Sequence, residues 1–159
     1  MEKSAGAVIF YKNLVSRSAR NKTKKGTIEY LLLQYPKLVK EPKKKRQIPG
    51  HWDFPKGHIE EGEEEAETVS REVLEETGIH ELTFMPGFRE TIRYFFQKEG
   101  KKVFKEVVFY LAQANSKNVT LSFEHLGFKW LPFPKALDIT TYKNAKMILQ
   151  KAHEFLTSR

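Results

Sequence analysis

The sequence contains no cysteine. Disulfides, thiolate metal ligands and thiol nucleophiles are therefore excluded. Long apolar runs are also missing, since a run such as Val107 to Ala112 is far shorter than the roughly 20 residues of a membrane-spanning helix. The N-terminus has no basic region followed by a long apolar stretch, so we expect no signal peptide. From these absences we expect a cytoplasmic protein with no membrane partner.

Acidic residues are concentrated in one segment, where basic residues are scarce. The segment from Glu60 to Glu76 holds nine glutamates and one base, Arg71, in a chain whose formal net charge is +8. Nine acids and one base leave this segment at −8, so the remaining residues carry +16. A basic body around one acidic segment suits an anionic ligand held through a bridging cation, and it also suits nucleic acid. A soluble basic surface without a partner explains the same charge equally well.

The length and composition favour a single domain over residues 1–159. The chain has 40% hydrophobic residues, including 12 Phe and 6 Tyr, which is enough for a sizeable core. Dense β-branched and aromatic runs predict strands at 4–12, 28–35 and 128–133 and a hairpin of 81–97 with 101–114. A C-terminal helix is predicted from apolar residues at three- and four-residue spacing, with Thr140 or Thr141 as its cap. Strands before, between and after two helices predict a mixed sheet covered on both faces.

Two basic segments are predicted to be loops. The first covers residues 13–26 and the second runs from Pro36 to Gly50, with three prolines and six basic residues. A solvated loop is one interpretation of the second segment. A patch that contacts phosphate or RNA is another, and a nuclear signal is a third.

The glutamates lie on a predicted helix that begins after Gly62 and closes at Gly78, a residue type that readily takes the left-handed conformation at a helix end. Glu63 to Glu65 then occupy the first turn, where negative charge meets the positive end of the helix dipole. The face formed by Ala66, Val69, Val73 and Thr77 is predicted to pack on the sheet.

Three carboxylates fall on another flank of this helix. Glu72 and Glu76 are one turn apart, and Glu75 lies close to both. An acid-rich solvated helix is the alternative. Against it, the only base on the helix is Arg71, and a glycine-containing turn precedes the helix. Grouped carboxylates suit a hard divalent cation, which shares its coordination sphere with substrate phosphates and offsets the repulsion.

This segment resembles the Nudix box, G-x5-E-x7-R-E-U-x-E-E-x-G-U, where U is aliphatic. The matching residues are Gly57, Glu63, Arg71, Glu72, Val73, Glu75, Glu76, Gly78 and Ile79. The resemblance implies an α/β/α sandwich around a central mixed sheet, and hydrolysis of a nucleoside diphosphate linked to another group, with Mg²⁺ or Mn²⁺ as cofactor.

The resemblance also implies roles for the residues of the box. Glu72, Glu75, Glu76 and the backbone carbonyl of Lys56 would bind the metal. Glu72 would also serve as the base that activates water, or would position that base. Arg71 would orient the neighbouring glutamates, and Glu63 would support the metal site from behind, while Gly57 and Gly78 shape the ends of the box.

Residues outside the box resemble the asymmetrical diadenosine tetraphosphate hydrolases of this family. The stretch "HWDFPKGH" matches their HW-x-x-PKGH pattern, and "LSFEHLGFKWL" is similar to a later segment. By this resemblance His51 and Lys56 would contact phosphates, Tyr94 would stack on a base and Glu124 would lie near the metals. As alternatives, Tyr94 is a core residue and Phe95 or Phe96 stacks instead, Glu124 is a surface residue, and His51 caps or packs.

Three functions are compatible with these residues. The first is cleavage of dinucleoside polyphosphates, such as diadenosine tetraphosphate, into ATP and AMP. The second is a pyrophosphohydrolase acting on the 5′ end of RNA or on another nucleotide, which the basic segments suggest, so nucleic acid is a possible but not the favoured partner. The third, a non-catalytic nucleotide-binding module, fits poorly because every box glutamate is present. The sequence does not predict the oligomeric state.

Overall fold

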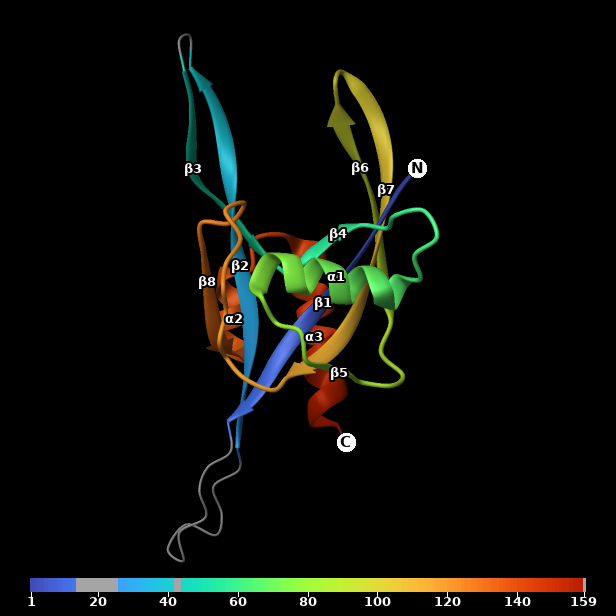
Figure 1. Ribbon diagram of the computed structural model, residues 1–159, viewed down its shortest axis with the longest axis vertical. Coiled ribbons are helices and arrows are strands. Elements are labelled where there is room, and N and C mark those ends of the chain that lie inside the picture. The colour runs from blue at the N-terminus through green and yellow to red at the C-terminus, as the bar shows by residue number, and fades with distance from the viewer. Residues whose placement is uncertain (14–25, 42–43, 159) are drawn as a thin grey trace, which may run out of the picture.

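The computed structural model describes residues 1–13, 26–41 and 44–158 (Figure 1). Eight strands and three helices follow one another along the chain. They are β1 (Glu2–Asn13), β2 (Thr27–Glu41), β3 (Lys44–Asp53), β4 (Lys56–His58), α1 (Glu65–Thr77), β5 (Leu82–Phe84), β6 (Glu90–Lys98), β7 (Lys101–Ala114), β8 (Gly127–Pro132), α2 (Phe133–Ile139) and α3 (Lys143–Thr157). No helix in the described part of the chain is long and apolar enough to span a membrane.

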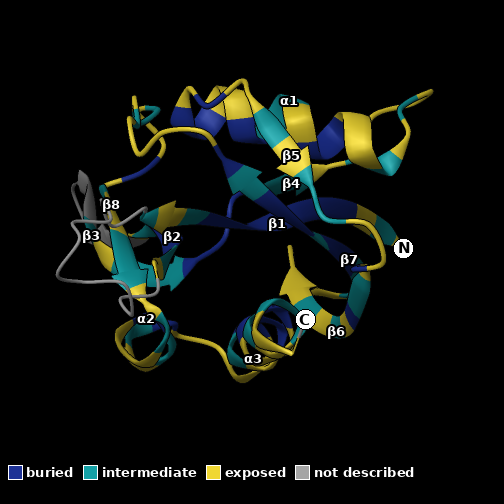
Figure 2. Ribbon diagram, turned by 90° about the horizontal axis from the view of Figure 1, so that it is seen from below, coloured by how far each residue is buried: buried dark blue, intermediate teal, exposed yellow. Residues whose placement is uncertain are grey.

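The strands form one mixed sheet, as the sequence predicts. Its main path runs β3-β2-β1-β7-β5, while β4 pairs with β1, β6 with β7 and β8 with β2. Only the β1–β7 pair is parallel, with Ala5 opposite Val108. Helix α1 covers one face, and α2 and α3 cover the other (Figure 2). The predicted α/β/α sandwich is therefore confirmed.

Strand β1 is buried from Ser4 to Phe10, because both of its faces are covered. Alternate residues enter two separate cores. Val8 and Phe10 pack with the cluster beneath α3, which includes Ile148. Ala7 and Ile9 join the cluster beneath α1. The small side chains near the start of this strand leave room for β4, where Gly6 lies opposite Lys56.

The prediction of a loop from Pro36 to Gly50 is wrong. This basic segment forms the outer arms of β2 and β3, which pair as far as Glu41 and Lys44. Two of its three prolines, Pro36 and Pro49, lie opposite each other, beside a register shift that follows Gln34. A bulge on the edge of a sheet tolerates proline, which cannot donate a ladder hydrogen bond. The other basic segment, 13–26, lies outside the described residues except at its ends.

The hairpin predicted to turn near Glu99 and Gly100 is confirmed. Strands β6 and β7 meet there, and both turn residues have positive φ, 51° and 76°. The beginning of the predicted first arm is instead a separate short strand, β5. The β2–β3 and β6–β7 hairpins project beyond the layers in the same direction (Figure 1). They stand on either side of β4, which leads into α1.

Helix α1 begins at Glu65, two residues later than predicted, with Glu64 as its N-cap. The backbone N–H of Glu64 donates to Glu67 Oε1 at 3.0 Å, and this contact caps the helix. Glu63 therefore lies in the loop before the helix. The helix ends at Gly78, whose φ is 73°, as predicted. Val69, Val73 and Thr77 are buried against the sheet, but Ala66 is exposed.

The C-terminal helix, α3, is confirmed, but its predicted cap is wrong. Tyr142 is the N-cap residue. Thr140 instead ends a third helix, α2, which was not predicted. The Thr141 hydroxyl accepts a 2.8 Å hydrogen bond from the backbone N–H of Trp52. This contact joins the start of α3 to β3.

Candidate active site

Arg71 and Glu63 join the loop before α1 to the helix. Arg71 donates from Nε to Glu63 Oε2 at 2.7 Å and from Nη2 to Glu63 Oε1 at 2.9 Å. Glu63 also accepts the backbone N–H of Glu60 at 2.9 Å. The hydrogen bonds from Arg71 and from the backbone lower the pKa of Glu63 to about 2. This charged pair ties the loop before α1 to the helix. The contact is compatible with the predicted role of Glu63, which is to support the metal site from behind.

The same guanidinium reaches the neighbouring carboxylates. Arg71 Nη1 lies 2.9 Å from Glu72 Oε1 and 3.4 Å from Glu75 Oε2. Arg71 Nη2 donates to the backbone carbonyl of His58 at 2.9 Å, so β4 also holds this side chain. Arg71 is thus anchored on several sides and positions Glu72, as an orienting residue must.

The carboxylate of Glu72 lies against the backbone of Gly57 in β4. A Cβ atom added at Gly57 would lie 2.0 Å from Glu72 Cδ, which no real contact allows. Glycine at this position therefore leaves the space that the carboxylate fills. Burial, followed by repulsion from Glu76, raises the pKa of Glu72 above its ordinary value.

Glu76 is buried, with 5% of its surface exposed. Its Oε2 accepts the backbone N–H of Lys56 at 3.1 Å, and its Oε1 lies 3.2 Å from His125 Nε2. Burial raises the pKa of Glu76 despite these contacts. The exposed residue Glu124 is near enough to add repulsion to Glu76, because the backbone N–H of Ser122 bonds to the Glu76 carbonyl and holds that loop at the end of α1.

No group of three or more His, Cys, Asp or Glu side chains converges as a metal site within the residues that the structure describes. Glu72 and Glu75 face Arg71, whereas Glu76 faces Lys56 and His125. The donor set nevertheless suits Mg²⁺ or Mn²⁺, which prefer carboxylate oxygens. The raised pKa values of Glu72 and Glu76 mean that ionising both carboxylates costs free energy, and a divalent cation would offset that cost.

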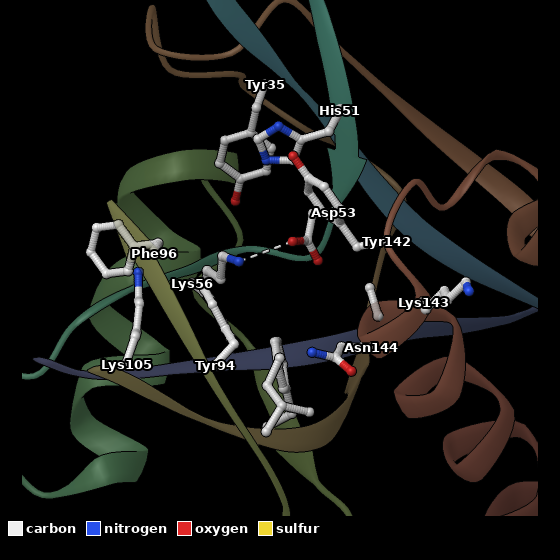
Figure 3. Close-up of a pocket in the computed structure, with 13 residues that line it drawn as sticks. Tyr35, His51, Asp53, Lys56, Tyr94, Phe96, Lys105, Tyr142, Lys143 and Asn144 are labelled. Atoms are coloured by element: carbon white, nitrogen blue, oxygen red, sulfur yellow. Dashed lines mark hydrogen bonds and ion pairs between the residues drawn. The ribbon is translucent and has the colours of Figure 1, made fainter. Parts of the chain in front are cut away.

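A cavity of about 650 Å³ opens on the α3 side of the sheet, between the bases of the two hairpins (Figure 3). Rings and cations dominate its lining. The residues are Tyr35, His51, Asp53, Lys56, Ile92, Tyr94, Phe96, Lys105, Phe109, Tyr142, Lys143, Asn144 and Ala145. Predicted residues His51, Lys56 and Tyr94 are thus brought together. Phe96 lines the cavity too, whereas Phe95 does not.

Two lysines place positive charge in this cavity. Lys56 Nζ forms a 2.9 Å ion pair with Asp53, drawn as a dashed line in Figure 3. Burial lowers the pKa of Lys56, but the Asp53 charge and hydrogen bond outweigh burial and raise it. Lys105 lies opposite Tyr94 across the β6–β7 ladder. Burial, followed by repulsion from Lys56, lowers the pKa of Lys105. A phosphate placed between two repelling cations would relieve that repulsion.

Stacked rings connect the cavity to the glutamates. His51 stacks on Tyr35 with ring centroids 4.8 Å apart, and it meets Tyr142 at 5.0 Å. Tyr35 in turn meets the edge of His125 at 4.5 Å. His51 therefore packs between two tyrosines while lining the cavity. Burial lowers the pKa of His51, which favours the neutral ring at neutral pH.

Sequence reasoning missed several of these residues. Tyr142 was not predicted to line the site, and Asp53 falls on a variable position of the HW-x-x-PKGH pattern. Lys105 could be assigned to the site only from the strand register, which pairs it with Tyr94. His125 gave a signal, because it follows Glu124 in the segment that resembles the hydrolases, but no role was assigned to it. The Lys56 backbone N–H contacts Glu76, and its carbonyl as a metal ligand stays a prediction.

Comparison with known proteins shows which proteins this chain is similar to. The NUDIX domain family matches residues 20–152. The chain is 35% identical over 160 residues to the asymmetrical bis(5′-nucleosyl)-tetraphosphatase of Mus musculus, covering 98% of this chain and 96% of the mouse protein. The crystal structure of a C. elegans Ap4A hydrolase binary complex superposes with a TM-score of 0.73 at 34% identity, covering 100% of both chains.

A shorter part of the chain is similar to an enzyme with a different activity. An RNA pyrophosphohydrolase of Helicobacter pylori is 43% identical over 49 residues, which is 31% of this chain and 32% of the bacterial protein. The family match, in contrast, spans most of the chain. Together with the intact box on α1, it shows that the chain belongs to the Nudix hydrolase family.

Proposed function

We propose that the protein hydrolyses dinucleoside polyphosphates such as diadenosine tetraphosphate, releasing ATP and AMP. The observation that carries this proposal is the continuity between the cavity and the glutamates of α1. Lys56 belongs to both, because its side chain lines the cavity while its backbone N–H contacts Glu76. A substrate with a base in the cavity would therefore extend its phosphates past Lys56 toward Glu72.

The cavity suits a nucleoside with phosphates attached. Tyr94, Phe96 and Tyr142 offer rings for a base. Lys56 and Lys105 offer cations for the phosphates, with His51 beside them. Neither Tyr94 nor Phe96 is fully enclosed, since both line open space. We therefore favour Tyr94 as a stacking residue and retain Phe96 as a second ring in the same role.

The acidic helix supplies the chemistry. Glu72, Glu75, Glu76 and the Lys56 carbonyl would hold Mg²⁺ or Mn²⁺, which supplies charge neutralisation at the phosphate oxygens and a more acidic water. Glu72 would accept the proton that water gives up as it attacks phosphorus, or would position the base that accepts it. Arg71 holds Glu72 against Gly57, and Glu63 holds Arg71. Glu124 lies close to Glu76 on the open side of the site, where it can take part in proton transfer.

Product analysis tests the proposal directly. Purified protein is incubated with diadenosine tetraphosphate and Mg²⁺, and the nucleotides are separated by chromatography. ATP and AMP in equal amounts support the proposal, whereas ADP alone or no release would refute it. Repeating the reaction in ¹⁸O-water shows which phosphorus is attacked, because the label enters only the product that contains that phosphorus. Glu72→Gln is the inactive control.

Removal of pyrophosphate from RNA 5′ ends is the second candidate. The basic sequence of the β2–β3 arms, with Lys44, Lys45 and Arg46 in succession, motivates it. The similarity to an RNA pyrophosphohydrolase covers only 49 residues. A 5′-triphosphorylated oligonucleotide that survives incubation unchanged would exclude this candidate. A protein that turns over nothing on a broad nucleotide panel would instead favour a binding module.

Two wider properties belong to the same proposal. We propose one Nudix hydrolase domain over residues 1–159, supported by a single sheet that links strands from β1 to β8. We also propose a cytoplasmic location, which suits a chain without cysteines, and cell fractionation tests it. Light scattering of the purified chain would establish its oligomeric state.

A further inference from the structure

The exposed ring of Phe95 is not used by the proposed site. Successive residues of a strand point to opposite faces, so Tyr94 and Phe96 line the cavity while Phe95 points to the other side of the β6–β7 hairpin. Its side chain is 59% exposed. A large ring in the middle of a strand and open to water offers a flat apolar surface to a ligand.

Phe95 belongs to a small cluster of rings and charge. Its ring centroid lies 5.0 Å from that of Phe104, which is its cross-strand partner. Lys102 Nζ lies 4.4 Å from the Phe95 centroid, over the ring. We call Phe95, Phe104 and Lys102 the outer platform. It combines an apolar ring with a cation that lies over the ring.

One ion pair and two lysines lie beside Phe95 on this face of the sheet. Arg93 and Glu106 neutralise each other in a 2.8 Å ion pair on the same face. Lys3 of β1 lies in register with Glu106 and is exposed. Among the described residues, no carboxylate lies within ion-pair distance of Lys102. Lys102 and Lys3 are therefore cations that an anionic ligand would meet first.

Strand alternation places the outer platform on one face of the sheet. Alternation along β7 places Lys102 and Phe104 on the face of the sheet to which Val108 belongs, and Val108 packs beneath α1. The outer platform thus shares a face with the acidic helix.

We infer that the outer platform binds single-stranded nucleic acid, with a base stacked on Phe95 and the adjoining phosphate at Lys102. Exposed rings beside cations bind single strands because every unpaired base has a face to stack and every nucleotide carries a phosphate. A duplex hides its base faces and would gain only the phosphate contact. The inference goes beyond the proposed hydrolysis and does not depend on it, since binding needs neither metal nor turnover.

Fluorescence anisotropy tests this inference. The probe is a labelled oligoadenylate of about 12 nucleotides, within the range of single-strand site sizes, as RNA and as DNA, without divalent metal. We expect Phe95→Leu to weaken binding about five- to hundredfold, the range for losing one stacked base. Phe95→Tyr keeps the flat ring and is expected to bind like wild type. Since both variants keep the contact with Phe104, a loss in the Leu variant alone identifies stacking rather than hairpin packing.

The charge contact is tested separately. Lys102→Glu is expected to weaken binding and to reduce the salt dependence by about one phosphate contact. Its matched control is Lys135→Glu on α2, an exposed lysine away from both hairpins, which changes net charge equally and should bind like wild type. Comparable losses in both lysine variants would show that net charge alone governs binding.

Besides comparable losses in the two lysine variants, three further results would overturn the inference. They are equal binding of Phe95→Leu and wild type, equal affinity for the duplex and the single strand, and tighter binding to phosphatidylserine vesicles than to the oligonucleotides. Hydrolysis of diadenosine tetraphosphate is measured on the same preparations. Wild-type hydrolysis without oligonucleotide binding defeats this inference alone, and binding without hydrolysis defeats only the proposed function.

Discussion

Replacing Gly57 with alanine should disable the active site while leaving the fold intact. A Cβ atom at Gly57 would lie 2.0 Å from Glu72 Cδ, and ordinary van der Waals contact begins at 3.4 Å. The Glu72 carboxylate must therefore retreat by roughly 1.4 Å, the difference between these distances. The backbone of Gly57 does not have the positive φ that would strain alanine. The atoms that must move are the end of a flexible side chain, so the fold can absorb the change.

The size of the effect follows from this displacement. A misplacement of about 1 Å in a catalytic constellation lowers the rate by about 100-fold. We expect kcat for diadenosine tetraphosphate to fall by about that factor in Gly57→Ala, with the unfolding midpoint lowered by no more than about 4 °C, the shift of a 1 kcal/mol loss in a domain of this size. Stopped-time chromatography of ATP and AMP gives kcat, and a thermal melt gives the midpoint.

A second glycine provides the matched control. A Cβ atom at Gly127 in β8 would lie 3.7 Å from Gln34 Oε1, an ordinary contact. Gly127→Ala should therefore keep both kcat and the midpoint. If Gly57→Ala hydrolyses the substrate at the wild-type rate, the position of Glu72 against Gly57 is not the catalytic one. If it unfolds, Gly57 serves the fold rather than the site.

Three further predictions concern charge. Lys105→Met should lower kcat/KM by about 10- to 100-fold by removing one charged hydrogen bond to phosphate, while the thermal midpoint stays within a few degrees, as a melt of the same sample will show. Asp53→Asn removes the partner that raises the pKa of Lys56, so the alkaline limb of the kcat/KM profile should move to lower pH, and an unmoved limb would contradict the assignment. The pKa of Glu72 is raised in the folded state, so the native state binds more protons than the unfolded state just above pH 4.5, and stability falls as pH rises through the folded pKa. Glu72→Gln should accordingly gain stability relative to wild type at pH 7 but not at pH 4, as urea unfolding at both pH values will test, and an equal difference at both would refute the sign.

The sheet and the acidic helix could be predicted because local patterns determine them. Runs of aliphatic and aromatic residues identified β1 and the β6–β7 hairpin, and Gly78 marked the end of α1. The β2–β3 arms could not be predicted in this way. Their prolines and lysines are typical of loops, and only pairing between the two arms, with a bulge after Gln34, stabilises them as strands.

The residues of the site also differ in whether local sequence or long-range contacts bring them together. Glu63, Arg71 and Glu72 lie on one local segment, so the match to the Nudix box was enough to group them. Lys105 and Tyr142 reach the cavity from β7 and from the start of α3, and their proximity to Lys56 depends on strand register and on helix packing. His125 meets Glu76 only because the loop after β7 is bonded to the end of α1. Long-range contacts of this kind leave no periodic signal in a sequence.

The central claim is that Glu72 and Glu76 hold a divalent cation beside the polyphosphate. Titration with Mn²⁺, followed by electron paramagnetic resonance of the free ion with and without a non-hydrolysable dinucleotide, measures this binding without turnover. Wild type is expected to bind Mn²⁺ more tightly when the nucleotide is present, and Glu72→Gln and Glu76→Gln are each expected to weaken binding by more than about tenfold. Wild-type affinity in both variants would contradict the account.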